Sequence, residues 1–216
     1  ASIDNISVRE IPGIHATQAT TANKPILRRG LLNQRIYSYD LANAAWNKGG
    51  DGSVTMNGNQ ATIQTTTTAV RYLTQTAPGY VAASGERITQ AIAIKKTTGT
   101  LTRYPVFASE QSIGSKLLGI TTIDTTNGIA TAWSAYTGFT ILPGSVASIA
   151  DYGDLWLVAL SGTTDTSAVV WTEFYPAAAS TATQSTGQVT GAIGPDVVVA
   201  GMGLFQGTYT AQQIID

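Results

Sequence analysis

Residues 155–160 (LWLVAL) constrain the fold most, because they form an unbroken apolar run with turn signals on both sides. Alternate side chains of a strand point to opposite faces, so both faces of this run are apolar. Such a strand must be covered on both sides. A helix is the competing interpretation, but Gly153 before the run and residues 161–163 (SGT) after it leave too little length. We therefore predict a central β-strand.

Short segments of strand character recur along the chain and are separated by turn signals. Examples are residues 88–96 (ITQAIAIKK), 168–175 (AVVWTEFY) and 197–205 (VVVAGMGLF). Gly58-Asn59 and Asn127-Gly128 are hairpin signals. The pattern corresponds to roughly ten to twelve short strands with no helical-period segment of useful length between them. We predict an all-β fold, an antiparallel β-sandwich of the jelly-roll type with an extended N-terminal arm.

Four local patterns add further predictions. Residues 40–46 (DLANAAW) could form one turn of helix, and Ala77-Pro78-Gly79 predicts a turn. Pro105 indicates that the strand at 101–108 lies at a sheet edge or contains a bulge. Residues 207–216 could start a short helix.

The chain divides into three parts. Residues 1–30 are expected to be an arm, with a strand at 2–11 and a linker that contains the only histidine, His15. Residues 31–207 form the predicted jelly roll, and residues 208–216 begin a following segment. Because the linker is long, we expect the first strand to close a preceding module or pair with another subunit. The chain starts with Ala-Ser, so we expect a fragment or a processed product.

Composition excludes several partners. The chain is 43% hydrophobic and 12% charged, about half the usual charge content. Its net charge is −1 and no basic patch is present, so we expect no nucleic acid. There are no cysteines, which excludes disulfides and thiolate chemistry. No apolar run approaches membrane-spanning length, and we expect no membrane insertion.

Two segments resemble the carbohydrate-binding-module-like jelly rolls of bacteriophage tail proteins. The first comprises Leu31-Leu32, residues 37–40 (YSYD) and residues 43–46 (NAAW), similar to the opening of such modules. The second is residues 151–157 (DYGDLWL), similar to an Asp-Xaa-Gly-Asn-Gly-Trp-Tyr pattern before a central strand. Here Leu157 replaces the usual Tyr, and Asp154-Leu155 replaces Asn-Gly.

Shorter matches extend the resemblance over most of the chain. Residues 89–95 and the Asn127-Gly128 hairpin occur in the expected order between the two main segments. Residues 3–13 resemble the closing strand of a preceding module, and residues 15–19 resemble the linker that follows it. Residues 203–208 together with 211–213 resemble the end of such phage modules.

The resemblance implies a bacteriophage virion structural protein on the exterior of the particle, in a tail fibre, tailspike or head fibre. It implies that the jelly roll attaches to host cell-surface polysaccharide and that other virion proteins are partners. A capsid-decorating or fibre-building module that binds no glycan is one alternative. A polysaccharide-degrading enzyme is the other.

A homotrimer is expected for two reasons. Residues 155–160 and 168–175 are apolar on both faces, whereas a lone two-sheet sandwich buries only one face of each strand. Neighbouring subunits or loops must cover the spare faces, and residues 177–188 are the candidate loop. Phage fibres are commonly threefold assemblies, which favours cyclic symmetry.

A sugar ring stacks its apolar face on an aromatic plane, so exposed aromatic residues are the glycan-site candidates. Those outside the obvious core strands are Tyr80, Tyr104, Trp133, Tyr136 and Tyr152. Ordinary packing or a subunit interface is the alternative for each. Trp46, Trp156 and Trp171 lie in strand-like contexts and are expected in the core.

No catalytic constellation is recognisable, and we predict that the protein is not an enzyme. Asp151 and Asp154 are the only tempting carboxylate pair, and Asp in a turn explains them more simply. We also expect no cofactor and no metal. Structural calcium is the alternative, because loops contain Asp51, Asp124 and Asp165, although their spacing resembles no known calcium loop.

Overall fold

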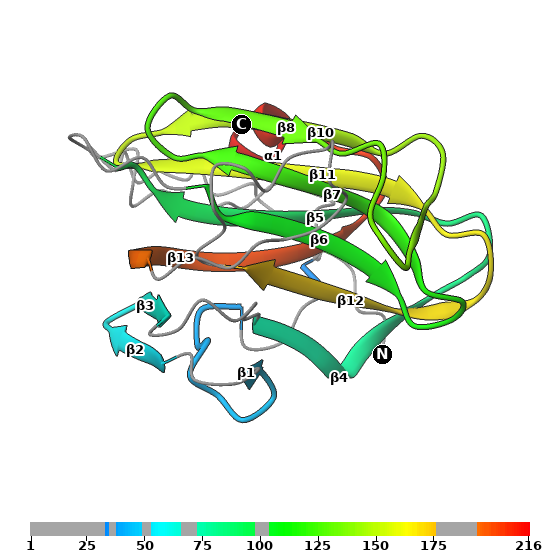
Figure 1. Ribbon diagram of the computed structural model, residues 1–216, viewed down its shortest axis with the longest axis horizontal. Coiled ribbons are helices and arrows are strands. Elements are labelled where there is room, and N and C mark those ends of the chain that lie inside the picture. Colours follow the sequence, from blue (N-terminus) through cyan, green and yellow to red (C-terminus); the bar gives the residue numbers. More distant parts are fainter. Residues whose placement is uncertain (1–32, 35–37, 49–52, 66–72, 98–103, 176–193) are drawn as a thin grey trace, which may run out of the picture.

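The computed structural model describes residues 33–34, 38–48, 53–65, 73–97, 104–175 and 194–216. They form thirteen β-strands and one short helix, arranged as two packed sheets (Figure 1). The predicted all-β sandwich is therefore confirmed. The strand predicted at 2–11, the linker with His15, the loop at 177–188 and Asp51 lie outside the described residues.

The two sheets contain seven and six strands. Sheet A has the order β1 (Asn47–Lys48), β4 (Leu73–Ala82), β12 (Ala168–Tyr175), β6 (Val106–Gln111), β7 (Lys116–Asp124) and β8 (Ile129–Ala132). Its last member, β9 (Thr140–Ile141), pairs in parallel with β7. Sheet B has the order β10 (Val146–Tyr152), β11 (Leu155–Thr163), β5 (Arg87–Lys95), β13 (Gly194–Gln206), β3 (Gln60–Thr65) and β2 (Ser53–Asn57).

Eight of these strands give the jelly-roll connectivity. Taken in chain order, β3, β4, β5, β6, β7, β11, β12 and β13 place β4-β12-β6-β7 in sheet A and β3-β13-β5-β11 in sheet B. The chain therefore crosses repeatedly between the layers, as two interleaved Greek keys require. The remaining strands extend the edges of the two sheets.

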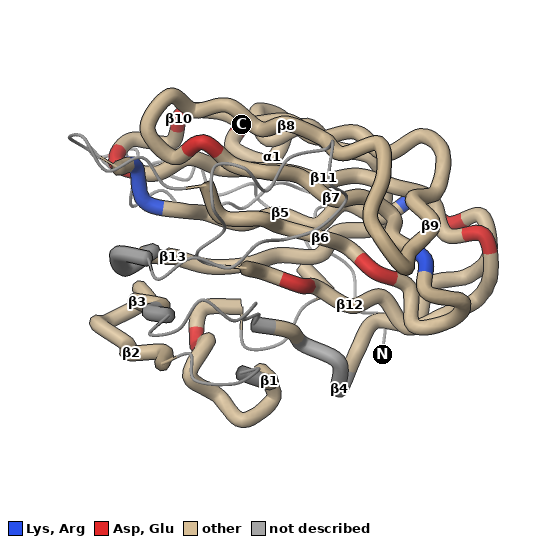
Figure 2. Tube along the Cα trace, in the orientation of Figure 1, with Lys and Arg blue, Asp and Glu red and all other residues tan. Residues whose placement is uncertain are grey.

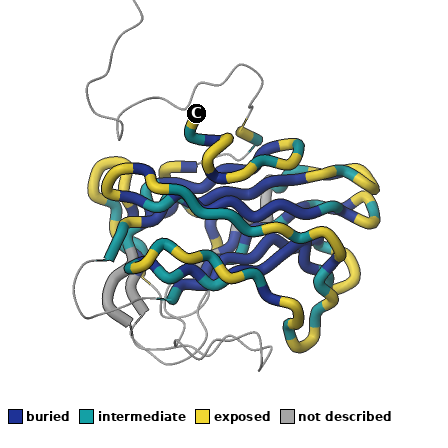
Figure 3. The backbone as a smooth tube through the Cα atoms, turned by 90° about the horizontal axis from the view of Figure 1, so that it is seen from above, coloured by how far each residue is buried: buried dark blue, intermediate teal, exposed yellow. Residues whose placement is uncertain are grey.

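Strand β11 is the predicted central strand, and both of its faces are covered. Val158 and Leu160 point inward and pack with Ile92 of β5 in the core between the sheets. Leu157 points outward and packs against Ile214 of helix α1 (Ala211–Ile215). Burial is continuous along the central strands, while the loops are exposed (Figure 3).

Helix α1 begins with a capping box. The Thr210 hydroxyl accepts from the backbone N–H of Gln213, and the Gln213 side chain accepts from the backbone N–H of Thr210. The backbone N–H of Ala211 donates to Ser148 Oγ at 2.8 Å, which attaches the helix to β10. Residues 208–216, expected to begin a following segment, thus lie against sheet B.

A fully buried amide joins the two sheets. The Gln90 side chain of β5 donates from Nε2 to Ser109 Oγ at 2.7 Å and to the Trp171 carbonyl at 2.9 Å. Its Oε1 accepts from the hydroxyl of Thr172. These partners belong to β6 and β12 of sheet A, so the network fixes how the sheets lie on one another.

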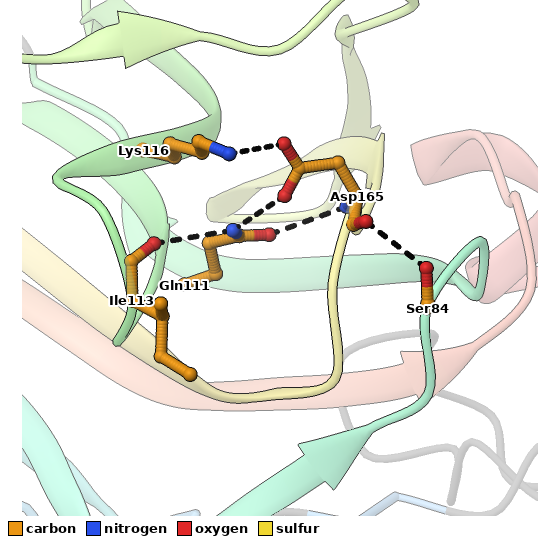
Figure 4. A network of polar contacts seen from close by, with 5 residues as sticks. All are labelled: Ser84, Gln111, Ile113, Lys116 and Asp165. Carbon is orange, nitrogen blue, oxygen red and sulfur yellow. Dashed lines mark hydrogen bonds and ion pairs between the residues drawn. The ribbon is translucent and has the colours of Figure 1, made fainter.

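Hydrogen bonds to Asp165 join several loops at one end of the sandwich. Asp165, between β11 and β12, accepts from Lys116 and Gln111 through its carboxylate and from the Ser84 hydroxyl through its carbonyl (Figure 4). The hydrogen bond to Lys116, followed by the one to Gln111, lowers the pKa of Asp165. Asp165 therefore has a structural role in joining these loops.

Three local predictions need correction. Residues 40–46 form turns rather than a helical turn. Ala77-Pro78-Gly79 lies within β4, where residues 76–79 bulge opposite Trp171 because Val170 pairs with Tyr80 and Thr172 with Gln75. The bulge accommodates Pro78, which has no N–H to donate. Pro105 precedes β6, which is an interior strand between β12 and β7.

Removing the amide that joins the sheets should destabilise the fold. We expect Gln90→Leu to lower the free energy of unfolding by about 1–3 kcal/mol, because Ser109, Thr172 and the Trp171 carbonyl would lose a buried partner. Urea denaturation of this variant and of exposed Gln60→Leu is the measurement. Equal midpoints for both variants and the parent would contradict the role of the network.

Truncating the Trp156 side chain should also destabilise the fold. Its half-buried ring packs against the core, Nε1 donates to the Thr125 carbonyl at 2.9 Å, and Lys96 Nζ lies 4.2 Å from the ring centroid. We expect Trp156→Ala to cost about 3 kcal/mol, the lower end of the range for large aromatic deletions. A melting temperature within about two degrees of the parent would show that the ring contributes little.

Candidate functional site

A groove of about 550 Å³ lies on the outer face of sheet B. Its floor consists of small side chains, because Gly201 pairs with Ala93 and Gly203 pairs with Ala91 at outward-facing positions. The flanking positions hold larger residues, including Leu157 of β11. The hollow therefore follows directly from the register of β5 and β13. We call it the sheet B groove.

Aromatic and aliphatic side chains form the walls. Tyr152 of β10 and Leu155 of β11 stand on one side, and Ile214 of α1 also lines the groove. The ring of Phe205 lies so close to Gly203 that a Cβ there would be 2.8 Å from it. The Phe205 ring therefore occupies the space that a side chain at position 203 would need.

Tyr39 is an exposed aromatic residue beside the floor of the groove. A Cβ at Gly201 would lie 2.9 Å from Tyr39 Cε1, so the ring lies against the sheet at this position. Tyr39 is nevertheless 60% exposed. Much of its aromatic surface is therefore accessible to a ligand.

The backbone before Tyr39 is anchored to the second half of β13. The Ser38 carbonyl accepts from Met202 N at 3.0 Å, and Gln34 N donates to the Leu204 carbonyl at 2.8 Å. Asn33 accepts from Leu204 N at 3.0 Å and donates to Ser38 Oγ at 2.8 Å. These bonds fix the direction from which Tyr39 reaches the groove.

Four polar side chains line the groove without a partner in the described part of the chain. Asn59 and Gln60 come from the β2–β3 hairpin, Lys95 from the end of β5, and Asp154 from the β10–β11 turn. They supply amide, ammonium and carboxylate groups. Because no intramolecular bond has to be broken, their hydrogen-bonding capacity is available to a ligand.

Tyr152 joins the aromatic and polar parts of the groove. It is 8% exposed. Burial, with the nearby Tyr39 hydroxyl as a smaller cause, raises the pKa of Tyr152. Its hydroxyl thus stays protonated at neutral pH.

The five predicted glycan candidates are not brought together. Tyr152 is the one that lines the sheet B groove. Trp133 is 4% exposed and donates from Nε1 to Thr122 Oγ1 at 2.7 Å, so its ring has no free face. Tyr136 is half-buried with its ring centroid 5.8 Å from that of Trp133, over sheet A.

The other two candidates lie elsewhere. Tyr80 of β4 is half-buried, and its hydroxyl donates to Glu86. Burial first, and then Glu86, raise the pKa of Tyr80 to about 12. Tyr104 is half-buried just before β6. Neither residue lines the sheet B groove.

The three tryptophans expected in the core differ in burial. Trp46 is fully buried between the sheets. Trp156 is half-buried against the same cluster. Trp171 is half-buried on β12, opposite Glu110 of β6.

Most residues of the sheet B groove were not predicted from the sequence. Those missed include Tyr39, Phe205, Lys95, Asn59 and Gln60. A signal did exist, because small residues alternate with large apolar ones at 91–94 (AIAI) and 201–204 (GMGL). Two such segments predict a hollow only if they pair in register on one face, and the sequence does not state that register.

Asp151 and Asp124, two of the acidic candidates, have structural partners. Asp151 pairs with Lys96 at 2.6 Å and accepts from Gly153 N at 3.1 Å within its turn. Asp124 accepts from the backbone N–H groups of Thr126 and Asn127. In the part of the chain that is described, no three His, Cys, Asp or Glu side chains are grouped as a metal site, and no helix is long and apolar enough to span a membrane.

Comparison with known proteins gives no family assignment, because neither a protein-family model nor a curated protein matches the sequence.

Proposed function

We propose that the sheet B groove binds glycans and that the protein is a bacteriophage virion module that attaches to host cell-surface polysaccharide. The observation that carries the proposal is that Tyr39 lies against Gly201, is 60% exposed, and stands beside polar side chains that have no partner among the described residues. The resemblance to carbohydrate-binding-module-like jelly rolls of phage tails supports the virion context.

The chemistry of the groove suits a sugar. A pyranose has an apolar face that stacks on an aromatic plane, and Tyr39 offers such a plane. Its hydroxyls need directional donors and acceptors, which Asn59, Gln60, Lys95 and Asp154 can provide. The small floor residues let a ring approach the sheet closely. An extended peptide gains less here, since the groove lies on a sheet face and offers no free strand edge.

Attachment without hydrolysis is the favoured form of this proposal. Glycoside hydrolysis uses two carboxyl groups about 5–9.5 Å apart that flank the bond to be broken. Of the carboxylate pair singled out in the sequence, Asp154 lines the groove, whereas Asp151 is engaged by Lys96. A virion module that binds no glycan remains the second candidate.

We expect Tyr39→Ala to reduce glycan affinity by at least about tenfold, which corresponds to about 1.4 kcal/mol. The measurement is binding of the chain to an array of bacterial capsular and lipopolysaccharide glycans, followed by calorimetry on the best glycan. Tyr39→Phe keeps the ring and should retain most of the affinity.

Two further variants distinguish glycan binding in the sheet B groove from binding at the aromatic cluster around Tyr136. Ala93→Leu would fill the floor and should abolish binding with little change in melting temperature, because Ala93 is half-buried at the surface. Tyr136→Ala, on the other sheet, should leave binding unchanged. Equal affinity of Tyr39→Ala and the parent would refute the site, and no binding to any glycan would favour the non-binding module.

A homotrimer is also part of the proposal. Segments of the chain cover the outer faces of β11 and β12 in part: α1 packs on β11, and residues 133–142 pack near Tyr175. The trimer therefore rests on the resemblance and on exposed apolar side chains at Val81, Ile113, Ile129 and Val146.

Native mass spectrometry at micromolar concentration tests the assembly. We expect a mass of three chains, which Val81→Lys should shift toward the monomer if β4 lies in the interface. A monomer in the parent protein would contradict a self-sufficient trimer.

A further inference from the structure

Two carboxyl groups meet on the outer face of sheet A, away from the sheet B groove. Glu110 of β6 pairs with Trp171, and Glu173 of β12 pairs with Ala108. The two glutamates are therefore diagonal neighbours on one face of adjacent strands. Figure 2 shows acidic positions on both strands.

The pair lies in a row of neighbouring polar side chains. Glu110 is 7% exposed, and its carboxyl group adjoins that of Glu173. Tyr175 donates from its hydroxyl to Glu173 Oε2 at 2.7 Å, and the Tyr136 hydroxyl adjoins that of Tyr175. No described Lys or Arg pairs with either carboxylate.

Two carboxyl groups that lie side by side at a largely buried position are most stable when one of them keeps its proton. Two adjacent carboxylates cannot both ionise cheaply without a cation nearby. Burial, and next the charge of Glu173, raise the pKa of Glu110 to about 8. This proton is therefore present at neutral pH and is lost under alkaline conditions.

The raised pKa of Glu110 determines whether stability rises or falls with pH. A carboxyl group whose pKa is higher in the folded state than in the unfolded state stabilises the fold while it is protonated. The contribution is complete below the ordinary glutamate pKa of about 4.3 and is lost as pH rises through about 8.

Tyr136 connects the pair to the segment that covers this face. Residues 133–142 leave sheet A after β8 and return to it through β9, which pairs with β7. Tyr136 packs between Trp133 and Phe139, with ring centroids 5.8 and 5.2 Å apart. Apart from Tyr136, this segment presents no titratable residue.

We propose that residues 133–142 form a pH-sensitive flap over sheet A, held closed by one proton shared between Glu110 and Glu173. Tyr175 and Tyr136 link this pair to the flap. Loss of the proton places two negative charges next to each other, beside the hydroxyls of Tyr175 and Tyr136. Their repulsion separates β6 from the Glu173 side chain and loosens the flap.

Hydrogen exchange read by mass spectrometry tests the flap directly. Protection factors of residues 133–142, corrected for intrinsic exchange, should fall at least about tenfold between pH 7 and pH 9.5 in the parent protein. Glu110→Gln and Glu173→Gln each remove the paired charge, so each should abolish most of this fall. Glu86→Gln is the matched control, because Glu86 bonds to Tyr80 and Ala83 and touches no other carboxyl group.

A carboxyl ¹³C titration of the parent protein gives an independent readout that needs no variant. It should reveal one glutamate that titrates near pH 8. Flat protection from pH 7 to 9.5, a fall that survives in both Glu110→Gln and Glu173→Gln, or the absence of any glutamate titrating above pH 6 would each overturn the proposal.

Discussion

The burial of both faces of β5 and β11 determines the rest of the structure. Their inward side chains, Ile92 and Val158 among them, need a second sheet, and sheet A supplies it. Their outward side chains need another cover, which α1 supplies over Leu157 and Ala159. Where α1 does not reach, β5 and its other neighbour β13 present Ala and Gly outward, and the face stays open as a groove. Strand β5 thus contributes to both the core and the candidate site.

Polar contacts determine how the two sheets are positioned relative to one another. Apolar packing alone tolerates sliding, whereas the buried Gln90 amide requires its partners at fixed positions on β6 and β12. The network around Asp165 plays a similar part at one end of the sandwich. In this chain, with only 12% charged residues, amides and hydroxyls therefore make a large contribution to specificity.

Much of the fold could be predicted from the sequence because strand signals are local. The two-sided run at β11, the hairpins at Gly58 and Gly128, and the alternation of β5 all depend on neighbouring residues, and all are confirmed. The turn predicted at Pro78 was wrong, because a bulge opposite Trp171 accommodates this residue within β4. Which aromatic side chains are exposed was harder to predict, because Trp133 is buried by a segment that folds back over sheet A. Tyr39 reaches the groove only through its anchoring to β13.

The central claim, that the sheet B groove receives a sugar, is tested most directly by a crystal structure of the protein with a bound oligosaccharide. We expect a pyranose ring stacked on Tyr39 near Gly201, with its hydroxyls bonded to at least two of Asn59, Gln60, Lys95 and Asp154. A sugar bound elsewhere, for example beside Tyr136 on sheet A, with the groove left to solvent, would contradict it.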